Sequence, residues 1–216
     1  MSTLLVKALL AYLLGSVIGS LVIGRLRGVD IRTLGSGNPG ATNALRTQGM
    51  KVGLTVLIID MFKGWFATSV LAGWPMSLGQ PADLQLAAWS APVCGIAVIL
   101  GHLYPVWFGF RGGKGVATFV GAIAGLSSLL LLVFVLTWLG AVVLLGFVGF
   151  ASLLGAVAVV IAIAAGNLPA RVPLLVFAVT TTALILYSHR ANLARMKAGT
   201  EPRAKRLWLF GTRRSG

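Results

Sequence analysis

Three short stretches of this chain gather the polar side chains that could bind or transform a charged ligand. They are residues 35–46, 101–118 and 189–203. Much of the remaining sequence is apolar, and residues 115–170 contain no Asp, Glu, Lys or Arg at all. Polar and charged groups are costly in an apolar surrounding, so their concentration in three places indicates where the chemistry takes place.

The first stretch has the pattern of an anion site at the start of a helix. Asn38 followed by Pro39 predicts an N-cap and a first helical turn. The backbone N–H groups of the next residues would then point outward without partners, and nearby glycines leave room for a phosphate. Thr42 and Asn43 each share a helix face with Arg46. An interfacial turn is the simpler explanation of Pro39 alone, but the whole pattern favours phosphate binding.

The second stretch is a glycine-rich loop that carries a lysine. It resembles a nucleotide-binding P-loop only superficially, because Gly115 follows Lys114 where Ser or Thr is expected and Phe108 replaces a required glycine. Nucleotide binding is therefore not supported. The lysine can still meet a phosphate, whereas His102 is open to either a packing or a catalytic role.

The third stretch and one apolar segment carry the remaining candidates. His189 and Asn192 lie three apart, which places them on one helix face. Asp60 and Lys63 show the same spacing inside an apolar segment, where a structural ion pair is expected. The two histidines are far apart and there is no Cys/His cluster, so no metal site is predicted.

The elements that must position these residues are membrane helices. The chain is 57% hydrophobic and 10% charged, whereas soluble domains carry about 25% charged residues. Four spans are expected at residues 3–24, 52–73, 86–104 and 172–188. Residues 115–170 suit three short spans with breaks near 138–140 and 149–152, although one re-entrant pair is an alternative. We therefore expect an all-α integral membrane protein, a single domain over residues 1–216 with about seven spans rather than five.

The distribution of cations predicts the orientation. The formal net charge is +14, and the cations flank apolar spans as the positive-inside rule requires, without the aromatic interleaving of a nucleic-acid groove. Residues 25–51 and the tail at 190–216 are rich in Lys and Arg, whereas residues 74–85 carry only Asp83. The N-terminus is thus expected outside, and the tail, the polar loops and short interfacial helices on the cytoplasmic side. Ser152 falls on that side too, and Arg171 is a single violation.

In this order the three stretches resemble the acyl-phosphate:glycerol-3-phosphate acyltransferases, the PlsY family. One departure is Arg111, where the family more often has lysine. The matching blocks are Ser36-Gly37-Asn38-x-Gly40-x-Thr42-Asn43-x-x-Arg46, Gly101-His102-x-x-Pro105 with Gly112-Gly113-Lys114-Gly115, and His189-Arg190-x-Asn192 with Gly199-Thr200-Glu201.

The resemblance implies a bacterial inner-membrane enzyme of phospholipid synthesis. It would transfer a fatty acyl group from acyl phosphate to the 1-hydroxyl of glycerol 3-phosphate, giving lysophosphatidate and inorganic phosphate. No cofactor and no nucleic acid are implied. The implied partners are the two substrates, membrane lipid and, functionally, an acyl-carrier-protein:phosphate acyltransferase that would make the donor.

The resemblance also implies roles for individual residues. Acyl phosphate would rest on the glycine-rich turn, and glycerol 3-phosphate would be held by Arg46, Lys114, His189 and Asn192. No protein residue is expected to be essential as a base. The implied catalytic residues are Ser36, Arg46, Lys114, His189 and Asn192. The implied binding residues are Gly37, Asn38, Gly40, Thr42, Asn43, His102, Gly112, Gly113 and Ser152.

Two other functions fit parts of the same pattern. A carrier for a phosphorylated metabolite would also have several spans and inner cations, but its polar groups would lie at the midplane or on both membrane halves. A membrane anchor without chemistry would tolerate replacement of Arg46 or Lys114.

Overall fold

The computed structural model describes residues 2–75, 84–167, 170–204 and 207–210. Those residues form helices and no strand, as the composition predicts. Asp83 lies outside the described residues. Contacts divide the chain into two compact units, Met1–Ser128 and Leu129–Gly216, here called the N-terminal and C-terminal units.

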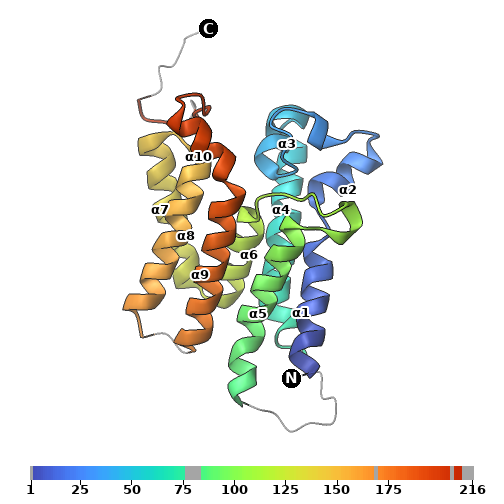
Figure 1. Cartoon of the computed structure of the whole chain (residues 1–216), viewed down its shortest axis with the longest axis vertical. Helices are drawn as coiled ribbons and strands as arrows, with labels where there is room; N and C mark the ends of the chain where they lie inside the picture. Colours follow the sequence, from blue (N-terminus) through green and yellow to red (C-terminus); the bar gives the residue numbers. More distant parts are fainter. Residues whose placement is uncertain (1, 76–83, 168–169, 205–206, 211–216) are drawn as a thin grey trace. The chain divides into compact units, whose positions relative to one another are not determined.

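In the N-terminal unit the two polar loops lie at the same end. The segment from α2 to α3 and the loop after α5 are neighbours in Figure 1, away from the N-terminus. Between α1 and α2 the chain bends by 45°. The elements are α1 (Ser2–Gly15), α2 (Gly19–Leu26), the short helix η1 (Ile31–Thr33), α3 (Ala41–Gln48), α4 (Met50–Phe66) with its π-helical end η2 (Ala67–Leu71), α5 (Leu84–Leu103), the short helix η3 (Val106–Phe108) and α6 (Val116–Leu126).

Glycines set the closest helix contacts of this unit. A Cβ on Gly121 of α6 would lie 2.7 Å from the carbonyl carbon of Met61 on α4, and one on Gly64 of α4 would lie 2.8 Å from the nitrogen of Ala122. Gly15 and Gly101 bring α1 and α5 together in the same way. Such small residues let helix backbones approach closely where lipid offers no hydrophobic driving force.

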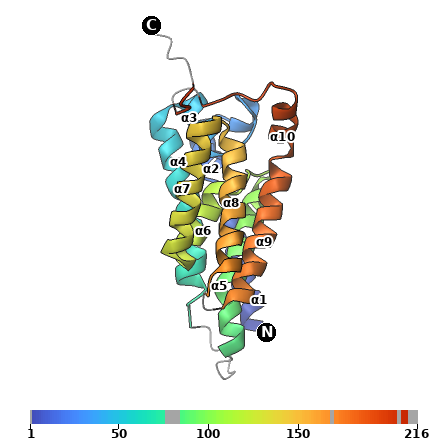
Figure 2. The ribbon, with the colours of Figure 1, turned by 90° about the vertical axis from the view of Figure 1, so that its left-hand side faces the viewer.

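The described part of the C-terminal unit contains four helices, and Figure 2 shows α8 beside α9. They are α7 (Ser128–Leu145), α8 (Val148–Ala165), α9 (Arg171–Ser188) and α10 (Arg190–Lys197). The three helices expected over residues 115–170 are present as α6, α7 and α8, but the predicted breaks at 138–140 and 149–152 are wrong, because both lie inside helices.

The true breaks lie at Ser127 and after Leu145. Ser127 is extended, and Gly146 has a φ of +79°, a left-handed conformation that ends α7. Gly140 continues its helix, and a Cβ added there would meet no packing neighbour within 4 Å among the described residues. Gly149 is small because it packs against α9 and α10, where a Cβ would lie 2.9 Å from the His189 ring. Neither glycine is therefore a helix breaker.

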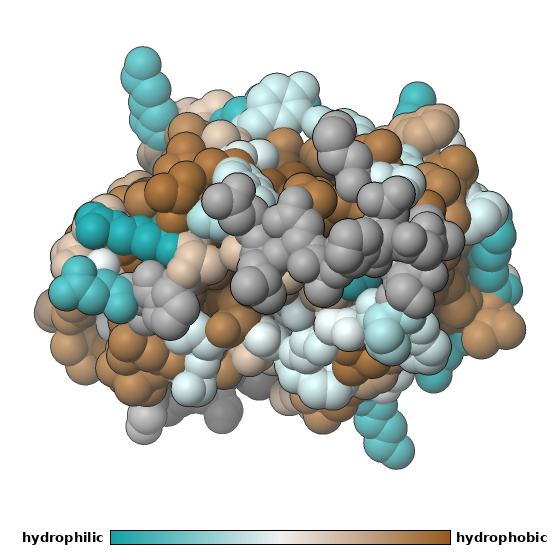
Figure 3. Space-filling view, turned by 90° about the horizontal axis from the view of Figure 1, so that it is seen from below, coloured by the Kyte–Doolittle hydropathy of each residue, from teal (hydrophilic) through white to brown (hydrophobic). Residues whose placement is uncertain are grey.

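Five of the described helices are long and apolar enough to cross a membrane, and the bent pair α1–α2 makes a sixth candidate. Helix α6 is apolar but has only 11 residues. These six candidate spans and the short helix α6 together equal the seven spans that the sequence predicts. Large apolar side chains are exposed along these helices, as a lipid-facing surface requires. Figure 3 shows the molecule from below, where brown, apolar residues lie next to paler and teal, polar ones.

Candidate active site

The turn before α3 is held in shape by Asn43. Its Oδ1 accepts a hydrogen bond from the Ser36 N–H at 3.0 Å, and its Nδ2 donates to the Leu34 carbonyl at 2.9 Å. Gly35 and Gly37 adopt φ values of +57° and +71°, which favour glycine. The Asn43 side chain is buried and its hydrogen-bonding groups are used within the protein. It therefore fixes the turn that carries Ser36.

Helix α3 begins later than the sequence pattern predicts. Its first residue is Ala41 and its N-cap is Gly40, so the prediction that Asn38 and Pro39 form the cap and first turn is wrong. The buried Ser20 hydroxyl donates to the Pro39 carbonyl at 2.8 Å, which ties this residue to α2 ahead of the helix. Within the described residues no side chain caps α3. The N–H groups of its first turn thus lack side-chain acceptors, as an anion site requires.

Three polar side chains around this turn are exposed. The Ser36 and Thr42 hydroxyls and the Arg46 guanidinium make no hydrogen bond or ion pair with other residues that the structure describes. Asn38 is half-buried and lies against Gly40, where a Cβ would come within 2.7 Å of its Nδ2. The turn therefore presents two hydroxyls, a cation and backbone amides to a ligand.

The glycine-rich loop before α6 folds back onto the end of α5. The N–H groups of Gly112 and Gly113 donate to the carbonyls of Leu103 and His102, each at 3.1 Å. A side chain at Gly113 would collide with the His102 ring, and a Cβ on Gly112 would lie 2.8 Å from the Leu103 oxygen. Glycine is thus required at both positions, and Lys114 follows them half-buried.

Behind this loop lies a buried polar cluster, Asp60, Lys63 and His102. The Lys63 ammonium is 3.0 Å from Asp60 Oδ1 and 2.8 Å from His102 Nδ1. The expected Asp60–Lys63 ion pair is confirmed. His102, predicted as a binding residue, is buried with its Nδ1 against Lys63.

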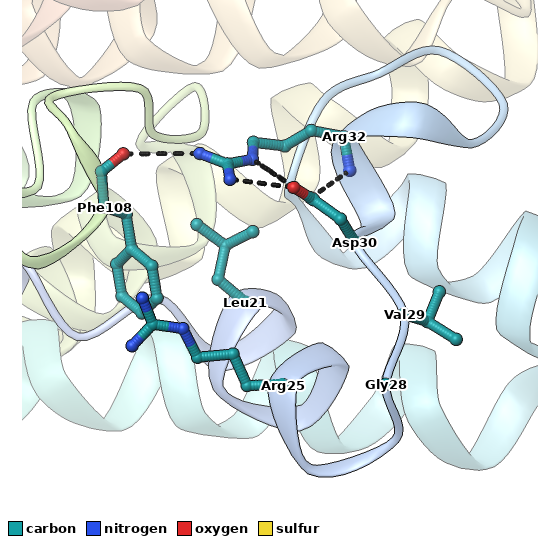
Figure 4. A pocket seen from close by; sticks show the side chains of 7 residues that line it. All are labelled: Leu21, Arg25, Gly28, Val29, Asp30, Arg32 and Phe108. Atoms are coloured by element: carbon teal, nitrogen blue, oxygen red, sulfur yellow. Dashed lines mark hydrogen bonds and ion pairs between the residues drawn. The ribbon is translucent and has the colours of Figure 1, made fainter.

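A cavity of about 310 Å³ lies between α2, the η1 segment and η3. Figure 4 shows Arg32 donating to Asp30 and to the Phe108 carbonyl, the latter at 3.3 Å, while the Arg25 guanidinium lies 4.7 Å from the centre of the Phe108 ring. Hydrogen bonding to Arg32 holds the pKa of Asp30 below its ordinary value. These contacts link the loop before α3 to the loop after α5.

In the C-terminal unit, His189 and Asn192 lie where α9 gives way to α10. His189 Nδ1 is 2.9 Å from the Ile185 carbonyl, so in the neutral ring this nitrogen carries the proton and Nε2 is the acceptor. Asn192 Nδ2 donates to Glu201 Oε1 at 2.5 Å. Gly149 packs against both residues. The structure thus brings together the two polar residues predicted from the third stretch.

Ser152 is buried one helical turn beyond Gly149. Its hydroxyl donates to the Val148 carbonyl at 2.9 Å and accepts from Trp138 Nε1 at 3.2 Å. The bond to Val148 lies within α8, and the bond from Trp138 links α7 to α8.

Sequence reasoning missed Ser20, and it missed further contacts of Lys63 and Glu201, two residues that it had singled out. Ser20 holds the turn at Pro39, and Lys63 contacts His102 as well as Asp60. Glu201 bonds both Asn192 and Arg195, the latter at 2.7 Å. Lys63 gave a signal in advance, because ionisable groups are rare in spans unless paired or functional, whereas nothing in the local sequence marks Ser20.

Comparisons with known proteins identify the family of the chain. The model of the glycerol-3-phosphate acyltransferase family matches residues 5–199. A glycerol-3-phosphate acyltransferase of Aquifex aeolicus (strain VF5) is 38% identical over 193 residues, covering 89% of this chain and 95% of the relative. One of Rhizobium meliloti (strain 1021) is 41% identical over 194 residues, covering 89% and 88%.

Solved structures give the same result. The fold is similar to crystal structures of PlsY (YgiH), an integral membrane glycerol 3-phosphate acyltransferase, in its glycerol 3-phosphate and lysophosphatidic acid forms. The TM-scores are 0.81 and 0.79, at 38% identity, covering 93% of this chain and 94% of the other. The chain is therefore an integral membrane protein of the glycerol-3-phosphate acyltransferase family.

Proposed function

We propose that this glycerol-3-phosphate acyltransferase takes its acyl group from acyl phosphate and delivers it to the 1-hydroxyl of sn-glycerol 3-phosphate. The products are lysophosphatidate and inorganic phosphate, the first acylation step of bacterial phospholipid synthesis. The observation that carries the proposal is the uncapped start of α3, ringed by exposed Ser36, Thr42 and Arg46.

The turn before α3 is suited to the phosphate of the acyl donor. Helix N–H groups favour an anion electrostatically, and hydroxyls donate hydrogen bonds to its oxygens. Gly37 and Gly40 keep the approach free of side chains, while Asn38 borders it. The Asn43 amide oxygen and nitrogen are both hydrogen-bonded within the turn, so we assign Asn43 a supporting role there rather than direct contact with the donor.

Glycerol 3-phosphate needs cations and hydrogen-bond donors of its own. We assign its binding to Arg46, Lys114, His189 and Asn192, the residues that the sequence resemblance implies for it. Gly112 and Gly113 shape the loop that carries the lysine. The PlsY structures that the chain resembles were solved with this substrate and with lysophosphatidic acid, which supports the same pair of ligands here.

The acyl transfer forms an ester and breaks a mixed anhydride. The hydroxyl oxygen of glycerol 3-phosphate attacks the carbonyl carbon, and the bond from that carbon to the phosphate oxygen breaks. The phosphate leaves with the electron pair, and cations beside it stabilise the charge that develops. Holding both reactants in line contributes about 7–11 kcal/mol to lowering the barrier.

The proton of the attacking hydroxyl passes to a phosphate oxygen of the donor in this proposal. Phosphate is a good leaving group, so a strong protein base is not needed. Among the three polar stretches Glu201 is the one carboxylate, and it is bonded to Asn192 and Arg195.

We also propose that the reaction takes place at the cytoplasmic face of the bacterial inner membrane. Cations crowd the loops around the proposed site, and the positive-inside rule puts such loops in the cytoplasm. Acyl phosphate made by an acyl-carrier-protein:phosphate acyltransferase would then reach the site from the cytoplasmic side. No cofactor enters this scheme.

The choice of donor is tested by comparing palmitoyl phosphate, palmitoyl-CoA and palmitoyl-acyl carrier protein with purified protein in detergent. Lysophosphatidate is measured by mass spectrometry at equal donor concentration. Product from palmitoyl phosphate alone is the expected result. Equal or faster product formation from either thioester would overturn the proposed donor while leaving the acyltransferase assignment in place.

A further inference from the structure

Lys63 lies at a buried junction in the membrane-spanning part of the N-terminal unit. Its ammonium donates to the carbonyls of Gly15 and Val17, at 3.0 and 2.9 Å, where the chain breaks between α1 and α2. The same nitrogen contacts Asp60 on its own helix and His102 on α5. One side chain thereby joins three helices at the bend that precedes α2.

One arm of this junction reaches the turn before α3. Asp60 Oδ1 accepts from the Gly19 N–H, the first residue of α2, at 3.4 Å. The next residue, Ser20, donates its hydroxyl to the Pro39 carbonyl at 2.8 Å. Two consecutive residues of α2 thus connect the buried ion pair to the turn that presents Ser36.

The other arm reaches the glycine-rich loop. His102 receives Lys63 at Nδ1, and its backbone carbonyl accepts the Gly113 N–H at 3.1 Å. Gly113 also packs directly on the imidazole ring. Any movement of His102 therefore moves the backbone next to Lys114.

Stability alone does not account for this cluster. A buried ion pair in a protein interior often gains nothing over apolar residues of similar volume, because removing both charges from water is costly. Here Asp60 Oδ2 is also buried without a hydrogen-bond partner among the described residues, which adds a further cost. What such a cluster does provide is a fixed geometry for the helices that it joins.

We infer that Lys63 is a positioning residue that sets the spacing between the turn before α3 and the glycine-rich loop. The inference rests on the proposed function insofar as that function assigns a phosphate to each loop. Among the described residues Lys63 makes no hydrogen bond or ion pair with either loop, and it acts through Asp60 and Ser20 on one side and through His102 on the other.

The test compares Lys63→Met with Lys7→Met. Lys7 is also a buried lysine of the N-terminal unit, but in the described part of the chain it donates to the Ala72 carbonyl and Ser90 and to neither loop. Both variants should lower the melting temperature. Only Lys63→Met should raise KM for glycerol 3-phosphate and for palmitoyl phosphate, each by about tenfold or more. Unchanged KM values, or equal increases in Lys7→Met, would overturn the inference.

Ser20→Ala tests one arm without disturbing the ion pair. It should raise KM for palmitoyl phosphate by about fivefold and leave KM for glycerol 3-phosphate unchanged. If Lys63→Met does not fold, this variant decides, because an unchanged KM for palmitoyl phosphate would contradict the connection.

Calorimetric binding of glycerol 3-phosphate without any donor separates this inference from the choice of donor. Weaker binding to Lys63→Met than to Lys7→Met supports the junction even if palmitoyl phosphate proves not to be the donor. Equal binding to both variants overturns it, whichever donor the enzyme uses.

Discussion

Asn43 and Arg46 lie three residues apart on α3 and serve the site in different ways. Asn43 is buried and bonded on both sides of its amide, so it holds the turn in place. Arg46 is exposed and makes no ion pair with the described residues. A side chain that the protein leaves unengaged next to an uncapped helix start is available to a phosphate.

Replacing Arg46 by Ala should lower kcat/KM for glycerol 3-phosphate by about 10²–10³, the range for losing one strong electrostatic contact in a transition state. Lys51→Ala is the matched control, since Lys51 is an exposed cation on the neighbouring helix α4 and should change the value by less than twofold. Steady-state kinetics on both variants decides, and a fully active Arg46→Ala would remove Arg46 from the site.

Replacing His189 by Gln tests whether the enzyme uses a protein base. General-base catalysis contributes about 10²–10⁴-fold, whereas a binding histidine mainly affects KM. We expect a higher KM for glycerol 3-phosphate and a loss in kcat well below about 10³-fold. Normal binding of both substrates combined with a larger loss in kcat would show that His189 takes the proton.

The ends of individual helices depend on where their glycines lie. Prediction of these ends from sequence succeeded for some helices and failed for others. The spans expected at 86–104 and 172–188 agree closely with α5 and α9, because long apolar runs mark helices directly. The break at Gly146 was missed and Gly140 and Gly149 were misjudged as helix breaks. A glycine can end a helix or admit a neighbour, and only the neighbouring helix determines which.

For the candidate site residues, too, prediction succeeded for local sequence patterns and failed for contacts between distant segments. The turn, the glycine-rich loop and the His189–Asn192 pair are local in sequence and could be predicted. The bonds from Lys63 to His102 and from Ser20 to Pro39 join different helices or segments, so no local pattern reveals them.

Replacing Gly121 by Ala should destabilise the N-terminal unit, because the added methyl group would press on the backbone of Met61. Overpacking of this kind costs about 1–3 kcal/mol. Gly140→Ala is the control, since the added methyl group would meet no packing neighbour within 4 Å among the described residues and Ala is the better helix former. Thermal unfolding in detergent should show a lower melting temperature for Gly121→Ala only. Equal melting temperatures would argue against close packing of α4 and α6.

At the scale of the whole molecule, the distribution of Lys and Arg predicts the orientation of the chain in the membrane. Ser2 should lie outside and Ala198, in the basic tail, inside. Both are exposed, and the native Cys94 is buried, so it should contribute little background. An impermeant maleimide should label Ser2→Cys on intact spheroplasts and Ala198→Cys only after permeabilisation. The reverse pattern would place the proposed site on the wrong face.

The coupling of the two products tests the proposed reaction most directly. Purified protein is given palmitoyl phosphate with and without glycerol 3-phosphate, and inorganic phosphate and lysophosphatidate are measured together over time. We expect phosphate release only when both substrates are present, with one lysophosphatidate formed for each phosphate. Phosphate release without glycerol 3-phosphate at the same rate, or lysophosphatidate formation without phosphate, would contradict acyl transfer from acyl phosphate.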